Sequence, residues 1–160
     1  MTESLTKHER TLSAVIHAST FSRFFIPFGN IILPLVLWLA NRKEYAFVDY
    51  NGKQALNFQI SLFLYSVIFG AISIPFFFGL IPDFFQHGIF EWRYREPFEG
   101  INFFIDWDDF PFHRLWPVGL AGLVPVALFV INVVYTILAT LRTHEGQVFK
   151  YPITINFIRS

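Results

Sequence analysis

The sequence predicts an all-α integral membrane protein that forms a single membrane domain over residues 1–160. The chain is 54% hydrophobic and 20% aromatic, with only 15% charged residues, and this composition is too apolar for a soluble domain of that length. Residues 54–82 and 115–141 contain no acidic or basic side chain. Each stretch exceeds the roughly 20 residues with which an α-helix crosses a bilayer. We therefore expect two full transmembrane helices, at 51–81 and 115–142.

The charge balance and the absence of cysteine exclude several kinds of function. Twelve Lys and Arg residues balance twelve Asp and Glu residues, so the chain lacks the basic surplus with which nucleic-acid-binding proteins neutralise phosphates. No cysteine is present, which excludes disulfides and thiolate metal sites. The expected partners are the lipid bilayer and either another membrane protein or further copies of the chain, and nucleic acid is not among them.

The N-terminal region, residues 9–41, admits two interpretations. Arg23 and the segment "IPFGN" (residues 26–30) interrupt its apolar stretch. Either a surface helix precedes one span from Phe24 to Ala40, or two short helices form a hairpin that turns at "IPFGN". The hairpin places nine Lys and Arg residues on one side and three on the other. The positive-inside rule then favours a multi-pass protein of the bacterial cytoplasmic (inner) membrane, with both termini in the cytoplasm.

The first predicted span begins with polar residues, in "FVDYNGKQALNFQIS" (residues 47–61). Asp49 or Asn51 is expected to cap the helix, and Pro75 and Gly79 to end or kink it. Spacings of three, four and four residues place a polar stripe on one helical face, made of Gln54, Asn57, Ser61 and Tyr65. Such a stripe should avoid lipid. It either forms hydrogen bonds within the bundle, as we expect of Asn57 and Gln59, or lines a path for a solute.

Residues 83–114 form an aromatic, acidic loop with seven acidic residues and three arginines. Aromatic and polar residues alternate around "EPFEG", which predicts a β-hairpin on the extracytoplasmic surface. Its Trp92, Tyr94 and Trp107 are candidate contacts for a partner. The acidic "DWDD" (residues 106–109) lacks the spacing and the turn glycine of a calcium loop, so we predict no metal site.

The C-terminal part comprises the second span and an extended tail. Pro125 should kink this span, and Asn132 is an isolated polar residue within it. In the tail, residues 147–159, Ile153, Ile155 and Phe157 alternate with polar residues, which is typical of an edge strand or an extended segment. Such a tail either packs across the ends of the helices or offers an edge to a partner. Tyr151 is a candidate contact in this segment.

No pattern of residues indicates catalysis. The five histidines are scattered, with neither the HExxH spacing nor a cysteine nucleophile, and no GxSxG or phosphate-binding glycine loop occurs. We therefore predict a protein that is not an enzyme, with no catalytic residue, no cofactor and no metal.

Two segments carry a resemblance to a known family. "PLVLWLANRKEYAFVDYNGKQALNFQIS" (residues 34–61) and "HEGQVFKYPITINFIR" (residues 144–159) resemble the bacterial Tic20-like family, also called domain of unknown function 4870. The resemblance implies a small membrane protein without an agreed activity, distantly related to four-helix subunits of chloroplast protein import. It implies a non-enzymatic accessory or scaffold subunit of a membrane assembly concerned with protein translocation. The alternative is a small oligomeric channel or carrier. The long loop at 83–114 departs from the family's pattern.

Overall fold

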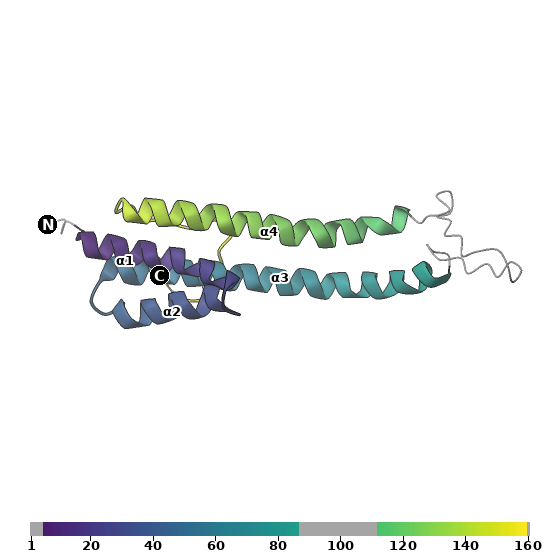
Figure 1. Cartoon of the computed structure of the whole chain (residues 1–160), viewed down its shortest axis with the longest axis horizontal. Coiled ribbons are helices and arrows are strands. Elements are labelled where there is room, and N and C mark those ends of the chain that lie inside the picture. Colours follow the sequence, from purple (N-terminus) through teal and green to yellow (C-terminus); the bar gives the residue numbers. More distant parts are fainter. Residues whose placement is uncertain (1–4, 87–111, 160) are drawn as a thin grey trace, which may run out of the picture. The chain divides into compact units, whose positions relative to one another are not determined.

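The computed structural model describes residues 5–86 and 112–159 (Figure 1). This part of the chain is helical and contains no strand, in agreement with the predicted fold class. Its elements are α1 (Lys7–Ala18), the 3-10 helix η1 (Ser19–Phe24), α2 (Gly29–Asn41), α3 (Ala46–Gln86) and α4 (Phe112–His144). The chain divides into two compact units, one of residues 1–66 with 127–160 and one of residues 67–126. The packing analysed below lies within the first unit.

The N-terminal region forms two short helices joined by a turn. Thr6 and Glu9 form a capping box that starts α1: the Glu9 N–H donates to the Thr6 hydroxyl and the Thr6 N–H to the Glu9 carboxylate. After η1 the chain turns at residues 25–28, and α2 packs against both α1 and η1. α2 has 13 residues, or about 20 Å at 1.5 Å per residue. It is therefore too short to cross a bilayer alone, as the hairpin interpretation expects.

Within the described part of the chain, two helices are long and apolar enough to cross a membrane, as predicted. The candidate spans are Ala46–Pro75 in α3 and Ala121–His144 in α4. α3 continues through Pro75 and Gly79 to Gln86, so neither residue ends it. Continuation of the helix keeps its backbone N–H and C=O groups paired in an apolar medium.

The predicted N-cap of α3 is wrong. The helix begins at Ala46, so Asp49 lies in its first turn, where a carboxylate suits the positive end of the helix dipole. Asn51 lies inside the helix and is buried. Its amide Nδ2 donates to the Phe47 carbonyl one turn earlier, so its side chain serves packing within the bundle.

The loop and the tail differ in how much of them is described. The β-hairpin predicted for 83–114 falls mostly on residues 87–111, outside the described part of the chain. Its two ends, residues 83–86 and 112–114, belong to α3 and α4. The tail after His144 is described to residue 159 and has an irregular backbone with turns.

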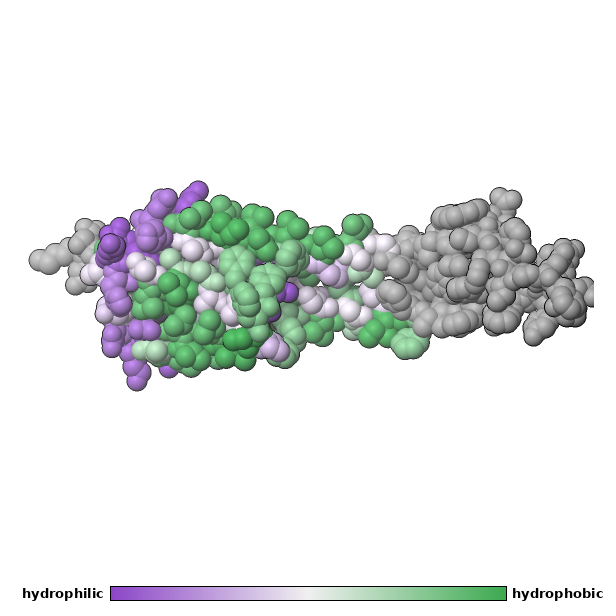
Figure 2. All heavy atoms as spheres, in the orientation of Figure 1, coloured by the Kyte–Doolittle hydropathy of each residue, from purple (hydrophilic) through white to green (hydrophobic). Residues whose placement is uncertain are grey.

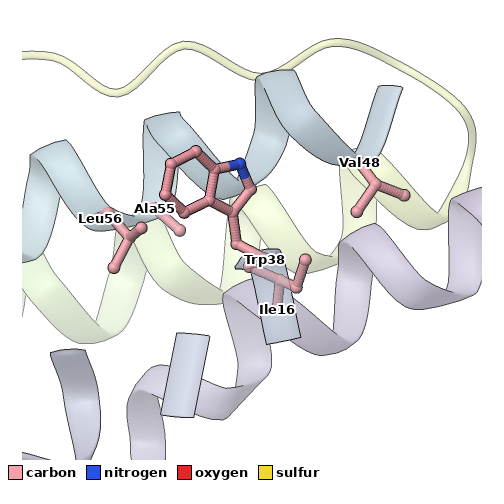
Figure 3. Packing of buried hydrophobic residues seen from close by; sticks show 5 residues of the cluster. All are labelled: Ile16, Trp38, Val48, Ala55 and Leu56. Carbon is pink, nitrogen blue, oxygen red and sulfur yellow. The ribbon is translucent and has the colours of Figure 1, made fainter. Parts of the chain in front are cut away.

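A tryptophan from α2 joins that helix closely to the start of α3. Trp38 belongs to a buried cluster with Ile16, Val48, Ala55 and Leu56 (Figure 3). Its indole Nε1 donates to the Asp49 carboxylate at 2.9 Å. The Arg42 guanidinium lies 4.9 Å from the centre of the indole ring, a cation–π contact. The Trp38 side chain thus contacts Arg42 at the end of α2 and Asp49 in the first turn of α3.

The surface of the first unit separates polar from apolar residues. In Figure 2, hydrophilic residues gather where α1 and α3 begin and where α2 and α4 end, and a hydrophobic surface follows. Exposed large side chains there include Phe24, Phe25, Phe28, Phe63 and Leu141. Contiguous apolar surface is limited on soluble monomers, and exposed side chains of this kind suit contact with lipid.

We predict that Gly52→Ala destabilises the fold. An alanine Cβ at this position would lie 2.9 Å from Trp38 Cβ and closer still to the indole ring. Overpacking of this kind costs about 1–3 kcal/mol, so thermal unfolding of the purified protein in detergent should occur at a lower temperature. Gly70→Ala is the matched control, because no atom lies within 4 Å of its added Cβ. Equal melting temperatures for the two variants would contradict the role assigned to Gly52.

Candidate functional site

The polar stripe of α3 binds the backbone of the C-terminal tail. The Asn57 amide donates to the Ile158 carbonyl and accepts from the Ile158 N–H, both at 2.8 Å. The Ser61 hydroxyl accepts from the Ile155 N–H at 2.8 Å. The Tyr65 hydroxyl donates to the Ile153 carbonyl at 2.8 Å. We call these three side chains and their four hydrogen bonds the tail ladder.

The tail ladder joins successive turns of a helix to a tail segment that bends. Asn57, Ser61 and Tyr65 lie four residues apart, about 6 Å along the helix, and they bind tail residues that are three and then two positions apart. The tail fits this spacing because Ile153 has a φ of 51° and the Phe157 N–H donates to the Ile155 carbonyl. The tail runs antiparallel to α3, since Ile158 lies at Asn57 and Ile153 at Tyr65.

The tail ladder provides hydrogen-bond partners for backbone groups of the tail. The three side chains lie in the candidate span of α3, and Asn57 and Ser61 are fully buried. Irregular backbone at membrane depth is tolerated only where protein or enclosed water satisfies its hydrogen-bonding groups. The stripe supplies those partners on one side of the tail. It thereby makes a segment without regular secondary structure compatible with an apolar environment.

A second group of side chains, the histidine cluster, joins the tail to α1, α3 and α4. His17, Asn51, Thr143 and Tyr151 are buried. The Tyr151 hydroxyl lies 2.9 Å from His17 Nδ1, and His17 Nε2 lies 3.3 Å from Asn51 Oδ1. The Thr143 hydroxyl also donates to Asn51 Oδ1. Tyr151 in turn stacks on Phe58 of α3, with ring centres 4.1 Å apart.

The hydrogen bonds of the histidine cluster define one protonation state. Asn51 Nδ2 donates to Phe47, so Asn51 Oδ1 acts as the acceptor and His17 Nε2 must donate. His17 Nδ1 then accepts from Tyr151, whose pKa burial raises so that the hydroxyl keeps its proton. Burial lowers the pKa of His17, on α1 outside the candidate spans, to about 4, and the Asn51 hydrogen bond only partly offsets this. The imidazole is therefore neutral at pH 7.

A third group, the amide cluster, joins α2, α3 and α4. The Gln59 amide donates to Asn132 Oδ1 at 3.0 Å, and Asn30 donates to Gln59 Oε1 at 2.9 Å. The Thr136 hydroxyl donates to Asn132 Oδ1 as well. Interhelical hydrogen bonds between such side chains contribute roughly 0.6–2 kcal/mol each in membrane proteins. Asn132, isolated in the sequence, thus has partners on two helices.

The chemistry of these three groups is that of binding and positioning. Their hydrogen-bonding atoms pair with one another or with the tail, and His17 is enclosed by the bundle. Within residues 5–86 and 112–159, no three His, Asp or Glu side chains gather in a way that could hold a metal ion. The site holds the C-terminal tail of the chain itself.

The predicted site residues fall in different places. Asn57, Ser61 and Tyr65 meet at the tail, whereas Gln54 is buried on α3 but takes no part in the tail ladder. Tyr151 lies 2% exposed in the core of the chain, where a partner would not reach it. The loop residues Trp92, Tyr94 and Trp107 lie outside the described residues and stay predictions.

The sequence reasoning missed the histidine cluster. His17 lies 34 residues from Asn51 and 134 from Tyr151, so no local spacing connects the three. One signal was available, because Ser13 and His17 lie one turn apart on the face of α1 that also carries Ala14 and Ile16, and all four are buried. A histidine on a buried helical face requires a hydrogen-bonding partner.

We predict that Ser61→Ala loosens the tail whereas Ser66→Ala does not. Both hydroxyls donate to the carbonyl four residues earlier, but only Ser61 also accepts from the Ile155 N–H. An unpaired buried N–H costs about 1–3 kcal/mol. Hydrogen–deuterium exchange should therefore quicken in residues 153–158 of the Ser61 variant alone. Unchanged exchange in both variants would argue against the tail ladder.

We predict that stability falls in acid because of His17. Burial lowers the pKa of His17 in the folded protein to about 4, below its ordinary value of 6.5. Between these two pH values the unfolded chain therefore binds a proton that the folded chain does not. The contribution of neutral His17 to the free energy of unfolding is fully present above about pH 6.5 and declines as the pH falls toward 4. At pH 7.5 the His17→Gln variant should have a lower melting temperature than the wild-type protein. On transfer to pH 5 its melting temperature should fall by less than that of the wild type. His144→Gln, at an exposed position, should keep the wild-type pH dependence; a shared loss of pH dependence would refute the assignment.

Comparisons with known proteins place the chain in a family other than the one expected. Searches of curated proteins and of solved structures give no match. A family model matches residues 8–158, and it describes the magnetosome magnetite crystal formation protein family, MamF/MmsF. The Tic20-like assignment is therefore wrong, and so is the translocation role inferred from it; the match gives the channel or carrier alternative no better support. The quoted segments mark helix ends near a membrane, where polar and aromatic residues are common in unrelated proteins.

The match extends over nearly the whole chain and covers α2, α3 and α4 in full, α1 from His8 and the tail to residue 158. It thus covers every residue of the tail ladder, the histidine cluster and the amide cluster. The chain belongs to the MamF/MmsF family, the magnetosome magnetite crystal formation protein family.

Proposed function

We propose that this protein is a multi-pass protein of the magnetosome membrane that contributes to magnetite crystal formation without catalysing a reaction. The observation that carries the proposal is the family match over residues 8–158 in a chain with two candidate spans. The exposed apolar side chains of the first unit support residence in a bilayer.

The proposed orientation follows from the distribution of charge. α3 and α4 each cross the membrane once, so the segment between them lies on the side opposite to both termini. The described chain carries Lys7, Arg10, Arg42, Lys43 and Arg142 near the helix ends on the terminal side, and basic residues favour the cytoplasm. Residues 87–111 then face the compartment in which the crystal grows.

The chemistry of the connecting segment fits this orientation. Residues 83–114 contain seven carboxylates and three arginines, which is a surplus of negative charge. Magnetite is an iron oxide, and carboxylate oxygens are suitable ligands for iron cations. A surface with this charge raises the local concentration of cations. The protein would thus act by attracting iron to the membrane surface, with the helical bundle as its anchor.

Deletion of the gene in a magnetite-forming bacterium tests the proposal. We expect fewer or smaller crystals by electron microscopy, and restoration by the wild-type gene. A tagged protein should co-purify with magnetically isolated crystals and should be depleted from the remaining inner membrane. Normal crystals in the deletion strain, or a protein absent from the crystal-bearing membranes, would contradict the proposal.

A charge variant tests the proposed mechanism separately. Complementation with Asp106→Asn, Asp108→Asn and Asp109→Asn combined should leave the protein in the membrane but restore crystals only in part. The control, Glu44→Gln with Glu145→Gln, removes exposed acids from the terminal side and should restore crystals fully. If both variants restored crystals fully, attraction of iron by this segment would be refuted while the family role stood.

A further inference from the structure

Arg23 carries a positive charge in the apolar part of the first unit. It belongs to η1 and is exposed. Its guanidinium lies 5.9 Å from the ring centre of Phe24 and 5.8 Å from that of Phe129 on α4. The turn that follows η1 is also apolar, with Phe25 87% and Ile26 51% exposed. The charge therefore adjoins apolar side chains and is accessible from outside the protein.

The position of Phe129 on α4 gives the depth of this guanidinium in the membrane. Residues 115–141 contain no charged side chain. Phe129 is 14 residues from one end of this stretch and 12 from the other, which is about 21 and 18 Å along the helix. A hydrocarbon core of about 30 Å placed anywhere within the stretch extends about 9 Å or more beyond Phe129 on each side. The Arg23 charge therefore lies inside the hydrocarbon core.

The two spans offer this charge no carboxylate at the same depth. Residues 54–82 and 115–141 contain no acidic side chain. Within the described residues the salt bridge joins Lys53 to Asp49 near the start of α3, and no hydrogen bond between side chains there involves Arg23. A guanidinium has five N–H donors, and the two aromatic rings attract its charge without supplying lone pairs to those donors. A charged side chain at this depth is costly unless it finds a partner.

We propose that the Arg23 guanidinium binds the phosphate group of a membrane phospholipid. Phosphate is the anion that the bilayer itself supplies, and its oxygens accept two parallel N–H bonds from a planar guanidinium. The long arginine side chain and local thinning of the bilayer bring the two groups together at this depth. The inference rests on residence in a bilayer and does not depend on the role in crystal formation.

The side chains around Arg23 favour a phospholipid over a free anion. Phe24, Phe25 and Phe28 are exposed beside the charge, so the surface combines one cation with a group of apolar side chains. A phospholipid matches both parts, because its phosphate suits the guanidinium and its acyl chains suit the phenylalanines. Inorganic phosphate would match the guanidinium alone and would have to leave water for an apolar environment, which is costly for an ion.

A distance measurement in phospholipid vesicles tests the proposal. The purified full chain, with ¹³C at the Cζ atom of its arginines, is placed in vesicles of phosphatidylglycerol and phosphatidylcholine. Rotational-echo double-resonance NMR then measures how lipid ³¹P dephases the ¹³C signal, and subtraction of the Arg23→Lys spectrum isolates the signal of Arg23. We expect most of this signal to be dephased as rapidly as direct contact requires. An Arg23 signal without dephasing, as water or the carboxylate of another chain would give, would overturn the proposal.

Thermal unfolding in a neutral maltoside detergent gives a second measurement, which also serves if Arg23→Lys fails to fold. Added phosphatidylglycerol should raise the melting temperature of the wild-type protein, and that of Arg23→Gln by less than half as much. The control Arg142→Gln removes a guanidinium near the end of α4 that donates to Gln147, and it should keep the full rise. Equal rises in all three proteins, a larger loss in the control, or an equal rise with inorganic phosphate would overturn the proposal.

Discussion

The requirement that every backbone N–H and C=O find a partner in an apolar environment governs this structure. Helices meet it internally, but the tail after His144 has no regular secondary structure. It returns along α3 and receives its partners from Asn57, Ser61 and Tyr65. The polar stripe that enters a hydrophobic helix is thus explained by the backbone that it binds.

The remaining polar side chains of the first unit connect elements that are distant in sequence. The histidine cluster joins α1, α3, α4 and the tail, and the amide cluster joins α2, α3 and α4. Buried polar groups are costly when unpaired, so these clusters penalise any other register of the helices. Apolar packing of Trp38 against α3 at Gly52 brings α2 close to α3. Apolar contacts hold the helices together here, and the polar clusters select one arrangement.

Membership of the MamF/MmsF family changes how the polar residues of the chain are understood. The buried polar residues, which could be read as a path for a solute, belong to the internal structure of the bundle. The surplus of carboxylates lies instead in the segment between α3 and α4.

The sequence by itself determined the helical class, the two candidate spans and the polar face of α3, because hydrophobic runs and helical periodicity are local properties. It also indicated two short N-terminal helices around "IPFGN", because proline and glycine interrupt helices locally. It did not place the start of α3, since Asn51 resembles a cap but bonds within the bundle. Only the tertiary structure decided that Asn57, Ser61 and Tyr65 bind the tail, and that His17 meets Asn51 and Tyr151. Those contacts join residues 34 to 134 positions apart, and hydrogen bonds over such separations depend on how the helices pack.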